Sequence, residues 1–224
     1  GLEPCRQVVA SWSEDDATRA REKLTAAGVA GDYAVLHASP KFKYKMWALE
    51  GWQECGSWLA ARGLRVVLTG GPDPAEREYV AQLARMLPAA ANLAGSLSLA
   101  ETASVLSRAR VYVGPDTAVT HLAAALGIPV VAVYGPTDPV KWGPWPARHE
   151  SAGGPWRRLG TQRVDNVMLV QGAGTCVPCL LEGCDRHIDS TSDCLQQLPA
   201  RRVIAAAAAL LDRDTSPASA MHAV

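Results

Sequence analysis

The run from Gly114 to His121 has the residues best suited to binding an anion. It reads Gly-Pro-Asp-Thr-Ala-Val-Thr-His, and it stands between an apolar run and an alanine-rich stretch. This order predicts a strand, a turn and the start of a helix. The first turn of a helix has N–H groups without intrahelical partners and a partial positive charge, which suits a diphosphate. Asp116 and Thr117 could equally be ordinary helix caps, and His121 could be a packed helix residue.

Strand and helix patterns alternate through the part of the chain that contains this run. The ranges predicted as strands are 33–37, 64–69, 91–94, 111–113, 130–134 and 166–170. The ranges predicted as helices are 13–27, 52–62, 75–86, 99–107, 116–126 and 199–212. Apolar strands that alternate with helices are typical of a parallel sheet covered on both faces.

The predicted sheet indicates where a ligand would bind. Parallel α/β sheets bind ligands beyond the carboxyl ends of their strands. Four loops follow such ends, namely His37–Trp47, Thr69–Glu76, Gly114–His121 and Tyr134–Trp145. We therefore expect these loops to form one site.

The stretch from Gly114 to Trp145 resembles the signature of glycosyltransferase family 9, the heptosyltransferases of lipopolysaccharide core synthesis. The shared pattern is an Asp-Thr turn, a His four residues after the Thr, an alanine-rich helix, Gly-x-Pro, a short strand and Gly-Pro-Thr-Asp-Pro. The chain departs from it at Ala118, where Gly is usual. Because Ala adopts a positive φ only at a cost, either the backbone is helical there or the phosphate approaches differently. The resemblance covers residues 31 to 195, approximately.

The resemblance implies roles for the loop that follows the first core strand. Ser39 and Lys45 would bind the donor diphosphate, and Lys45 would stabilise the leaving group as a point charge. Lys41 and Lys43 are also present, so the loop could simply be basic and solvated. In the family this loop has a Lys shortly before a Trp. Among the three lysines, Lys45 is preferred because Trp47 fixes the alignment with that pattern.

The resemblance also implies roles for the other loops. Glu76 would accept the ribose hydroxyls, with Asp73 as its competitor; Glu76 could also be a first-turn residue favoured by the helix dipole. Thr137 and Asp138 would lie in a loop that closes over the site, although turn chemistry alone explains them. The donor-binding residues predicted in this way are Ser39, Lys45, Glu76, Asp116, Thr117, Ala118, Val119 and His121.

The patterns predict an α/β fold with a Rossmann-like doubly wound parallel sheet. The resemblance implies that this sheet forms one half of a GT-B glycosyltransferase. A Cys-containing C-terminal segment and a terminal helix follow it. Residues 1–30 are expected to be an interdomain connection with a helix, and 31–150 the nucleotide-sugar-binding domain. Residues 151–224 would form a Gly/Pro/Trp loop, the cysteine segment and a helix packed on that domain. The family's other domain carries the acceptor site and an acidic general base. That domain does not fit before Tyr33, so we expect the chain to be inactive alone.

The function implied by the resemblance is inverting transfer from a nucleotide-diphospho-sugar, ADP-heptose-like, to a lipid-linked or oligosaccharide acceptor of lipopolysaccharide biosynthesis. No cofactor is required if a Lys and a helix end supply the positive charge. The expected location is cytoplasmic, at the inner membrane's cytoplasmic face, with peripheral association through the other domain. The alternatives are a UDP-sugar-using GT-B transferase or epimerase, and a non-catalytic nucleotide-binding or metal-structured module.

Four cysteines lie close together near the end of the chain, at Cys176, Cys179, Cys184 and Cys194. The first pair has the spacing of a zinc knuckle, but no second Cys-x2-Cys follows. The residues leave three alternatives open, which are a structural metal such as zinc, reduced packed thiols, or disulfides. A metal held by four cysteines would be structural rather than catalytic.

Composition excludes two classes of function. Lys and Arg number 22, as do Asp and Glu, so the formal net charge is zero. This balance is unlike that of nucleic-acid-binding proteins, and no nucleic-acid partner is expected. No apolar run reaches the roughly 18 residues of a membrane span.

Overall fold

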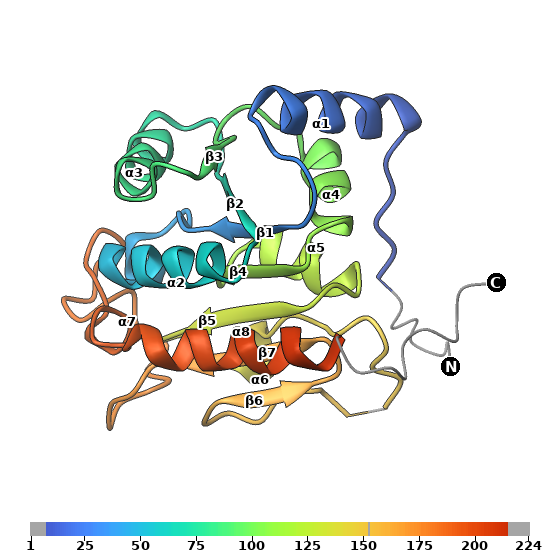
Figure 1. The fold of residues 1–224 in the computed structure, drawn as a ribbon. Coiled ribbons are helices and arrows are strands. Elements are labelled where there is room, and N and C mark those ends of the chain that lie inside the picture. Colours follow the sequence, from blue (N-terminus) through green and yellow to red (C-terminus); the bar gives the residue numbers. More distant parts are fainter. Residues whose placement is uncertain (1–7, 152, 215–224) are drawn as a thin grey trace.

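A seven-stranded sheet runs through the computed structural model, which describes residues 8–151 and 153–214 (Figure 1). Its strand order is β3-β2-β1-β4-β5-β7-β6. The parallel strands are β1 (Tyr33–His37), β2 (Arg65–Thr69), β3 (Ala91–Asn92), β4 (Val111–Pro115), β5 (Val130–Tyr134) and β7 (Val167–Gln171). Only the edge strand β6 (Gln162–Val164) is antiparallel, and it pairs with β7. The predicted doubly wound α/β fold is confirmed.

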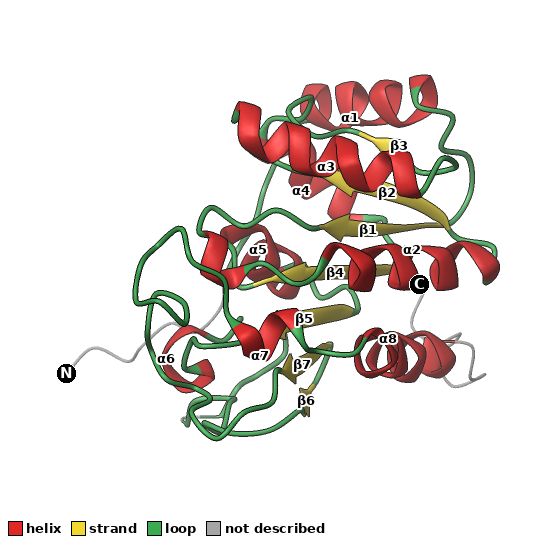
Figure 2. Ribbon diagram, turned by 90° about the vertical axis from the view of Figure 1, so that its left-hand side faces the viewer, coloured by secondary structure: helices red, strands yellow, loops and turns green. Residues whose placement is uncertain are grey.

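Helices cover both faces of this sheet (Figures 1 and 2). One layer contains α1 (Glu14–Ala26), α4 (Leu99–Ser107) and α5 (Ala118–Ala125), and the other contains α2 (Leu49–Ala61), α3 (Pro74–Met86) and α8 (Ala200–Asp214). Three short helical turns complete the set, namely η1 (Lys43–Lys45), α6 (Pro139–Trp142) and α7 (Asp193–Gln196). No helix of the described residues is both long and apolar enough to cross a bilayer.

The central strands are apolar throughout because each one is buried on both sides. In β1, Ala34 and Leu36 pack into the core under α2 and α8, whereas Tyr33 and Val35 pack into the core under α4 and α5. Both faces therefore contribute to stability, at about 1.5–3 kcal/mol for each large apolar side chain. This double burial explains why the strands show continuous apolar runs rather than an alternating pattern.

Local signals in the sequence fix several helix starts. Ser13 caps α1 and Ser98 caps α4, each in a reciprocal capping box with the residue three positions on. Asp73 caps α3, where its carboxylate accepts hydrogen bonds from the amides of Ala75 and Glu76. These caps satisfy N–H groups that a helix start would otherwise leave unpaired.

The helix expected in the segment 1–30 is α1, and it packs on α4 through the buried residues Ala20 and Leu24. Several features differ from expectation, and α2 begins three residues before the predicted Trp52, at Leu49. The predicted helix 116–126 begins later, at Ala118, because Thr117 has extended backbone and serves as its N-cap. The edge strand Gln162–Val164 was not predicted, since it lies within a range rich in Gly, Pro and Trp.

Candidate functional site

The strand order reverses at β1, because β2 and β3 lie on one side of it and β4 and β5 on the other. A cavity of about 480 Å³, which we call the main cavity, lies beyond the carboxyl ends of these strands. This is the place where doubly wound sheets bind ligands. Its lining comes from the loops after β1, β2 and β4 and from the start of α4, namely His37, Ser39, Lys41, Phe42, Lys45, Thr69–Pro72, Glu76, Leu97, Leu99, Thr102 and Asp116–Val119.

Seven of the eight predicted donor-binding residues line the main cavity, and they are Ser39, Lys45, Glu76, Asp116, Thr117, Ala118 and Val119. The exception is His121, which is not among the lining residues. Its side chain is 42% exposed, and its Nε2 lies 3.9 Å from Asp116 Oδ1. His121 is therefore adjacent to a lining carboxylate rather than part of the cavity wall.

An ion pair joins two of the loops at the cavity. Lys45 Nζ lies 2.7 Å from Asp116 Oδ2. The Tyr134 hydroxyl donates to the other oxygen of Asp116 at 3.3 Å. Burial acts to raise the pKa of Asp116, but contacts with His121 and Lys45 outweigh it, and the pKa lies below its ordinary value. Asp116 is thus an ionised, buried carboxylate whose nearest cation is Lys45.

The start of α5 presents backbone donors to the main cavity. The first backbone amides in this helix that donate to a preceding carbonyl are those of Thr120 and His121. Both donate to the Thr117 carbonyl. Ala118 and Val119 precede them and line the cavity. Ala118 opens the helix and is not among the residues with positive φ, so its side chain causes no backbone strain there. The helical alternative for Ala118 is the one found.

The structure separates the two candidates for the ribose carboxylate. Glu76 lines the main cavity, where its Oε2 accepts a hydrogen bond of 2.8 Å from the Gly71 amide. A Cβ at Gly71 would lie only 2.6 Å from that oxygen, so a larger residue here would displace the Glu76 carboxylate. Asp73 is exposed and does not line the cavity, because it caps α3 instead.

Sequence reasoning gave no role to two parts of the cavity wall. His37 ends β1, is buried, and has its Nδ1 3.0 Å from Thr69 Oγ1. Burial lowers the pKa of His37 to about 4, so its ring is neutral at pH 7. Leu97 and Leu99 also line the cavity at the start of α4. Their position follows from the capping motif at Ser98 only once the preceding strand, β3, is placed in the sheet.

A second cavity, of about 390 Å³, shares Phe42 and Lys45 with the main cavity. Its other lining residues are Tyr44, Pro136, Thr137, Trp142, Leu180, Leu181 and Glu182. It thus combines aromatic rings with a cation and a carboxylate. Asp138 is not part of its wall, since its carboxylate accepts from the Val140 amide at 3.0 Å and caps α6.

The four clustered cysteines line a further cavity of about 230 Å³. All four are free thiols, so the disulfide alternative is not found. Burial, followed by the neighbouring cysteines, raises the pKa of Cys194 to about 12. Across residues 8–151 and 153–214, no three His, Cys, Asp or Glu side chains are arranged to hold a metal ion.

The cysteine segment, residues 176–198, is tied to the loops of the two cavities. The Ser192 hydroxyl donates to the Tyr44 carbonyl at 2.7 Å. The side-chain amide of Gln196 donates to the Met46 carbonyl at 2.8 Å. The Leu180 amide donates to the Pro136 carbonyl at 2.9 Å. The segment therefore supports the loop that contains Lys45.

Comparison with known proteins gives a consistent result. The model of glycosyltransferase family 9 (heptosyltransferase) matches residues 4–171. The chain is 32% identical over 142 residues to lipopolysaccharide heptosyltransferase 3 of Escherichia coli, over 62% of this chain and 42% of that protein. It is 42% identical over 111 residues to lipopolysaccharide heptosyltransferase 1 of E. coli K12, over 49% of this chain and 34% of that protein. The chain thus spans less than half the length of these relatives.

Solved structures show the same likeness. The E. coli ADP-heptose lps heptosyltransferase II aligns with a TM-score of 0.68 at 19% identity, over 94% of this chain and 54% of that chain. This match is a likeness of fold. The E. coli heptosyltransferase WaaC with ADP aligns with a TM-score of 0.57 at 30% identity, over 82% of this chain and 46% of that chain.

Proposed function

Because this chain belongs to glycosyltransferase family 9, we propose that it binds the nucleotide-diphospho-sugar donor of an inverting glycosyltransferase. The donor is ADP-heptose-like, and the acceptor belongs to lipopolysaccharide biosynthesis. The observation that carries this proposal is the main cavity, in which a lysine, two open helix amides and a carboxylate meet at the switch point of the sheet. The E. coli heptosyltransferase WaaC, whose structure was solved with ADP, supports the choice of nucleotide.

The diphosphate is the part of the donor that the chemistry of the cavity suits best. The Lys45 ammonium can pair with phosphate oxygens, and the amides of Ala118 and Val119 can donate to them at the positive end of α5. Asp116 would hold Lys45 in place rather than contact the phosphates, because two anions repel each other.

The two ends of the donor would then lie on either side of Lys45. The ribose would contact Glu76, and the base would lie against the apolar wall at Leu97 and Leu99. The sugar would enter the second cavity, which shares Lys45 and has Tyr44 and Glu182 in its wall. This arrangement accounts for the lysine common to both cavities.

Transfer would proceed by one displacement. A carboxylate takes the proton of an acceptor hydroxyl, and the hydroxyl oxygen forms a bond to the anomeric carbon of the sugar. The bond from that carbon to the diphosphate breaks on the opposite face, which inverts the configuration. Lys45 and the start of α5 stabilise the charge that develops on the diphosphate. We assign no residue of this chain as the base and propose that the chain alone does not turn over.

Isothermal titration with ADP and UDP tests the proposal. We expect ADP to bind more tightly than UDP. The heat of each injection should fall to zero once ADP saturates the site. Absence of binding by either nucleotide at millimolar concentration would contradict donor binding. Tighter binding of UDP would favour a UDP-sugar-using enzyme, and sugar transfer by this chain alone would contradict the assignment of the base elsewhere.

A structural metal at the four cysteines, one of the alternatives that the sequence leaves open, stays a prediction, as does peripheral association with the cytoplasmic face of the inner membrane. Metal analysis of the purified protein, with a Cys176→Ser/Cys179→Ser double variant as control, decides the state of the cluster. Stoichiometric metal that is lost in the double variant, with ADP binding intact, would identify a structural metal.

A further inference from the structure

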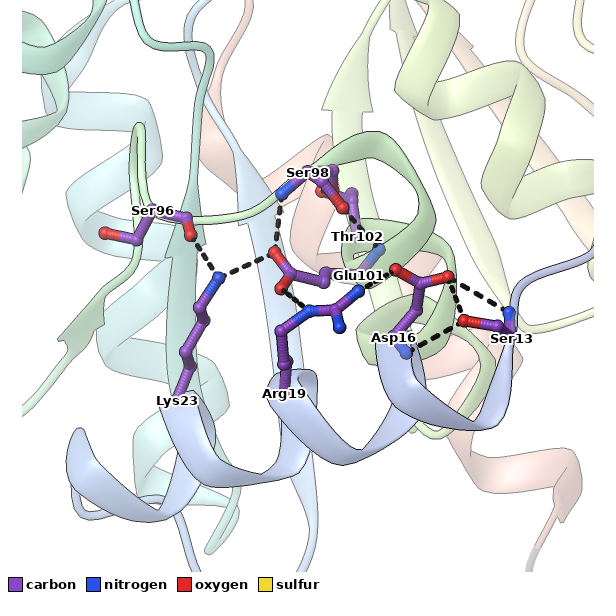
Figure 3. Close-up of polar contacts among 8 residues, drawn as sticks. All are labelled: Ser13, Asp16, Arg19, Lys23, Ser96, Ser98, Glu101 and Thr102. Carbon is purple, nitrogen blue, oxygen red and sulfur yellow. Dashed lines mark hydrogen bonds and ion pairs between the residues drawn. The ribbon is translucent and has the colours of Figure 1, made fainter.

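Helix α1 is fastened to the start of α4 by one buried carboxylate (Figure 3). The side chain of Glu101 is only 4% exposed. Its Oε1 accepts a hydrogen bond of 3.1 Å from Arg19 Nε, and its Oε2 lies 2.7 Å from Lys23 Nζ. The same Oε2 accepts a hydrogen bond of 2.7 Å from the Ser98 amide. Glu101 thus joins two cations of α1 to the backbone of another element.

Lys23 makes a second contact, with the backbone on the N-terminal side of Leu97. Lys23 Nζ also donates to the Ser96 carbonyl at 2.8 Å. The residue between these two backbone contacts is Leu97, which lines the main cavity. Thr102, another lining residue, is bound to the Ser98 carbonyl through both its amide and its hydroxyl. The backbone on both sides of Leu97 is therefore held by the Lys23–Glu101 pair.

This arrangement exceeds what helix capping requires. The capping box of α4 needs only Ser98 and Glu101, and α1 has a similar box of Ser13 and Asp16 at its exposed end. At α4 a buried carboxylate receives two cations from a separate helix. A buried carboxylate is costly unless it is paired, and removing one partner leaves it uncompensated. Burial acts to raise the pKa of Glu101, but bonds from Lys23 and Ser98 outweigh it and leave the pKa below its ordinary value.

We propose that Lys23, Arg19 and Glu101 are positioning residues that set the cavity wall of residues 97–102 for the nucleoside end of the donor. The inference rests on the proposed function and adds a group of residues to it. None of the three lines the main cavity, so they act through the wall. The wall contributes Leu97, Leu99 and Thr102, and Leu99 is 67% exposed. Apolar side chains of this kind suit the face of a planar base and offer nothing to a phosphate.

The test separates the nucleoside end from the phosphate end by using two ligands, ADP and inorganic pyrophosphate. In Lys23→Met, we expect the Kd for ADP to rise about tenfold and the Kd for pyrophosphate to change less than about twofold. The control is Arg85→Met, which removes an exposed salt bridge of 3.0 Å within α3 and should change neither Kd. Lys23→Arg keeps a cation at the position and should restore ADP binding.

A merely structural role would lower the melting temperature of Lys23→Met without this selective loss. If Lys23→Met does not fold, Glu101→Gln gives the same test, because Gln retains the capping hydrogen bond and removes the charge. Equal ADP affinity in wild type and variant would overturn the inference and leave the proposed function standing. An equal loss of affinity for ADP and for pyrophosphate would have the same meaning. If the wild type binds no ADP, the proposed function and the inference both fail.

Discussion

Lys45 Nζ and Asp116 Oδ2 lie 2.7 Å apart, and they join the loop after β1 to the loop after β4 across the point where the strand order reverses. The pair holds the lysine where the amides of α5 begin. A diphosphate that enters must share the ammonium with Asp116. Its affinity therefore depends on the geometry of this pair as well as on charge.

Replacement of Lys45 by Met should weaken both ADP and pyrophosphate by about tenfold or more, because the cation nearest the phosphate end is lost. The matched control is Lys43→Met on the same short helix, since Lys43 does not line the main cavity. Titration calorimetry of both variants checks the effect. Equal ADP affinity in Lys45→Met and wild type would remove Lys45 from the site.

Replacement of Ala118 by Gly, the residue usual in the family, should leave the Kd for ADP within about twofold, because Ala118 already has helical backbone. The free energy of unfolding should fall by about 0.5–1 kcal/mol, since Gly loses more backbone entropy in a helix. Urea denaturation measures the stability. A large gain in ADP affinity would mean that Ala118 obstructs the phosphate.

Replacement of Glu76 by Gln should reduce the preference for ADP over 2′-deoxy-ADP, because a carboxylate accepts a ribose hydroxyl more strongly than an amide does. Glu78→Gln is the control, since Glu78 lies on the same helix and pairs with Arg85 at the surface. Competition binding with the two nucleotides gives the ratio. An unchanged ratio in Glu76→Gln would assign the ribose to another residue.

Stability should fall between pH 6.5 and pH 4 through His37. The pKa of this buried ring is lowered from 6.5 to about 4, so in this window the unfolded chain takes up a proton that the folded chain does not. The loss approaches about 3 kcal/mol at the acid end of the window. Urea denaturation at several pH values checks it, and His37→Gln should flatten the slope above pH 4.5. An identical slope in the variant would assign the proton to another group.

The sequence predicts most of the sheet because its strands are buried on both faces and so appear as apolar runs. The family resemblance selects Lys45, Glu76 and Asp116, and the rule that loops after parallel strands converge at one edge explains why they lie together. The sequence does not predict that Asp116 is paired with Lys45 or that His37 is neutral, because both depend on packing. Leu97 could not be predicted because nothing in its local pattern distinguishes a cavity wall from an ordinary turn.

The hydrogen bonds between the cysteine segment and the loop of Lys45 affect when that loop can fold during translation. Ser192, Gln196 and Leu198 contact Tyr44, Met46 and Trp47 across 148, 150 and 151 positions of sequence. Closing such long loops is among the slower steps of folding. On the ribosome, the loop would emerge before these partners and wait until 148 to 151 further residues had been translated. Its final shape is therefore set only after the cysteine segment has been synthesised.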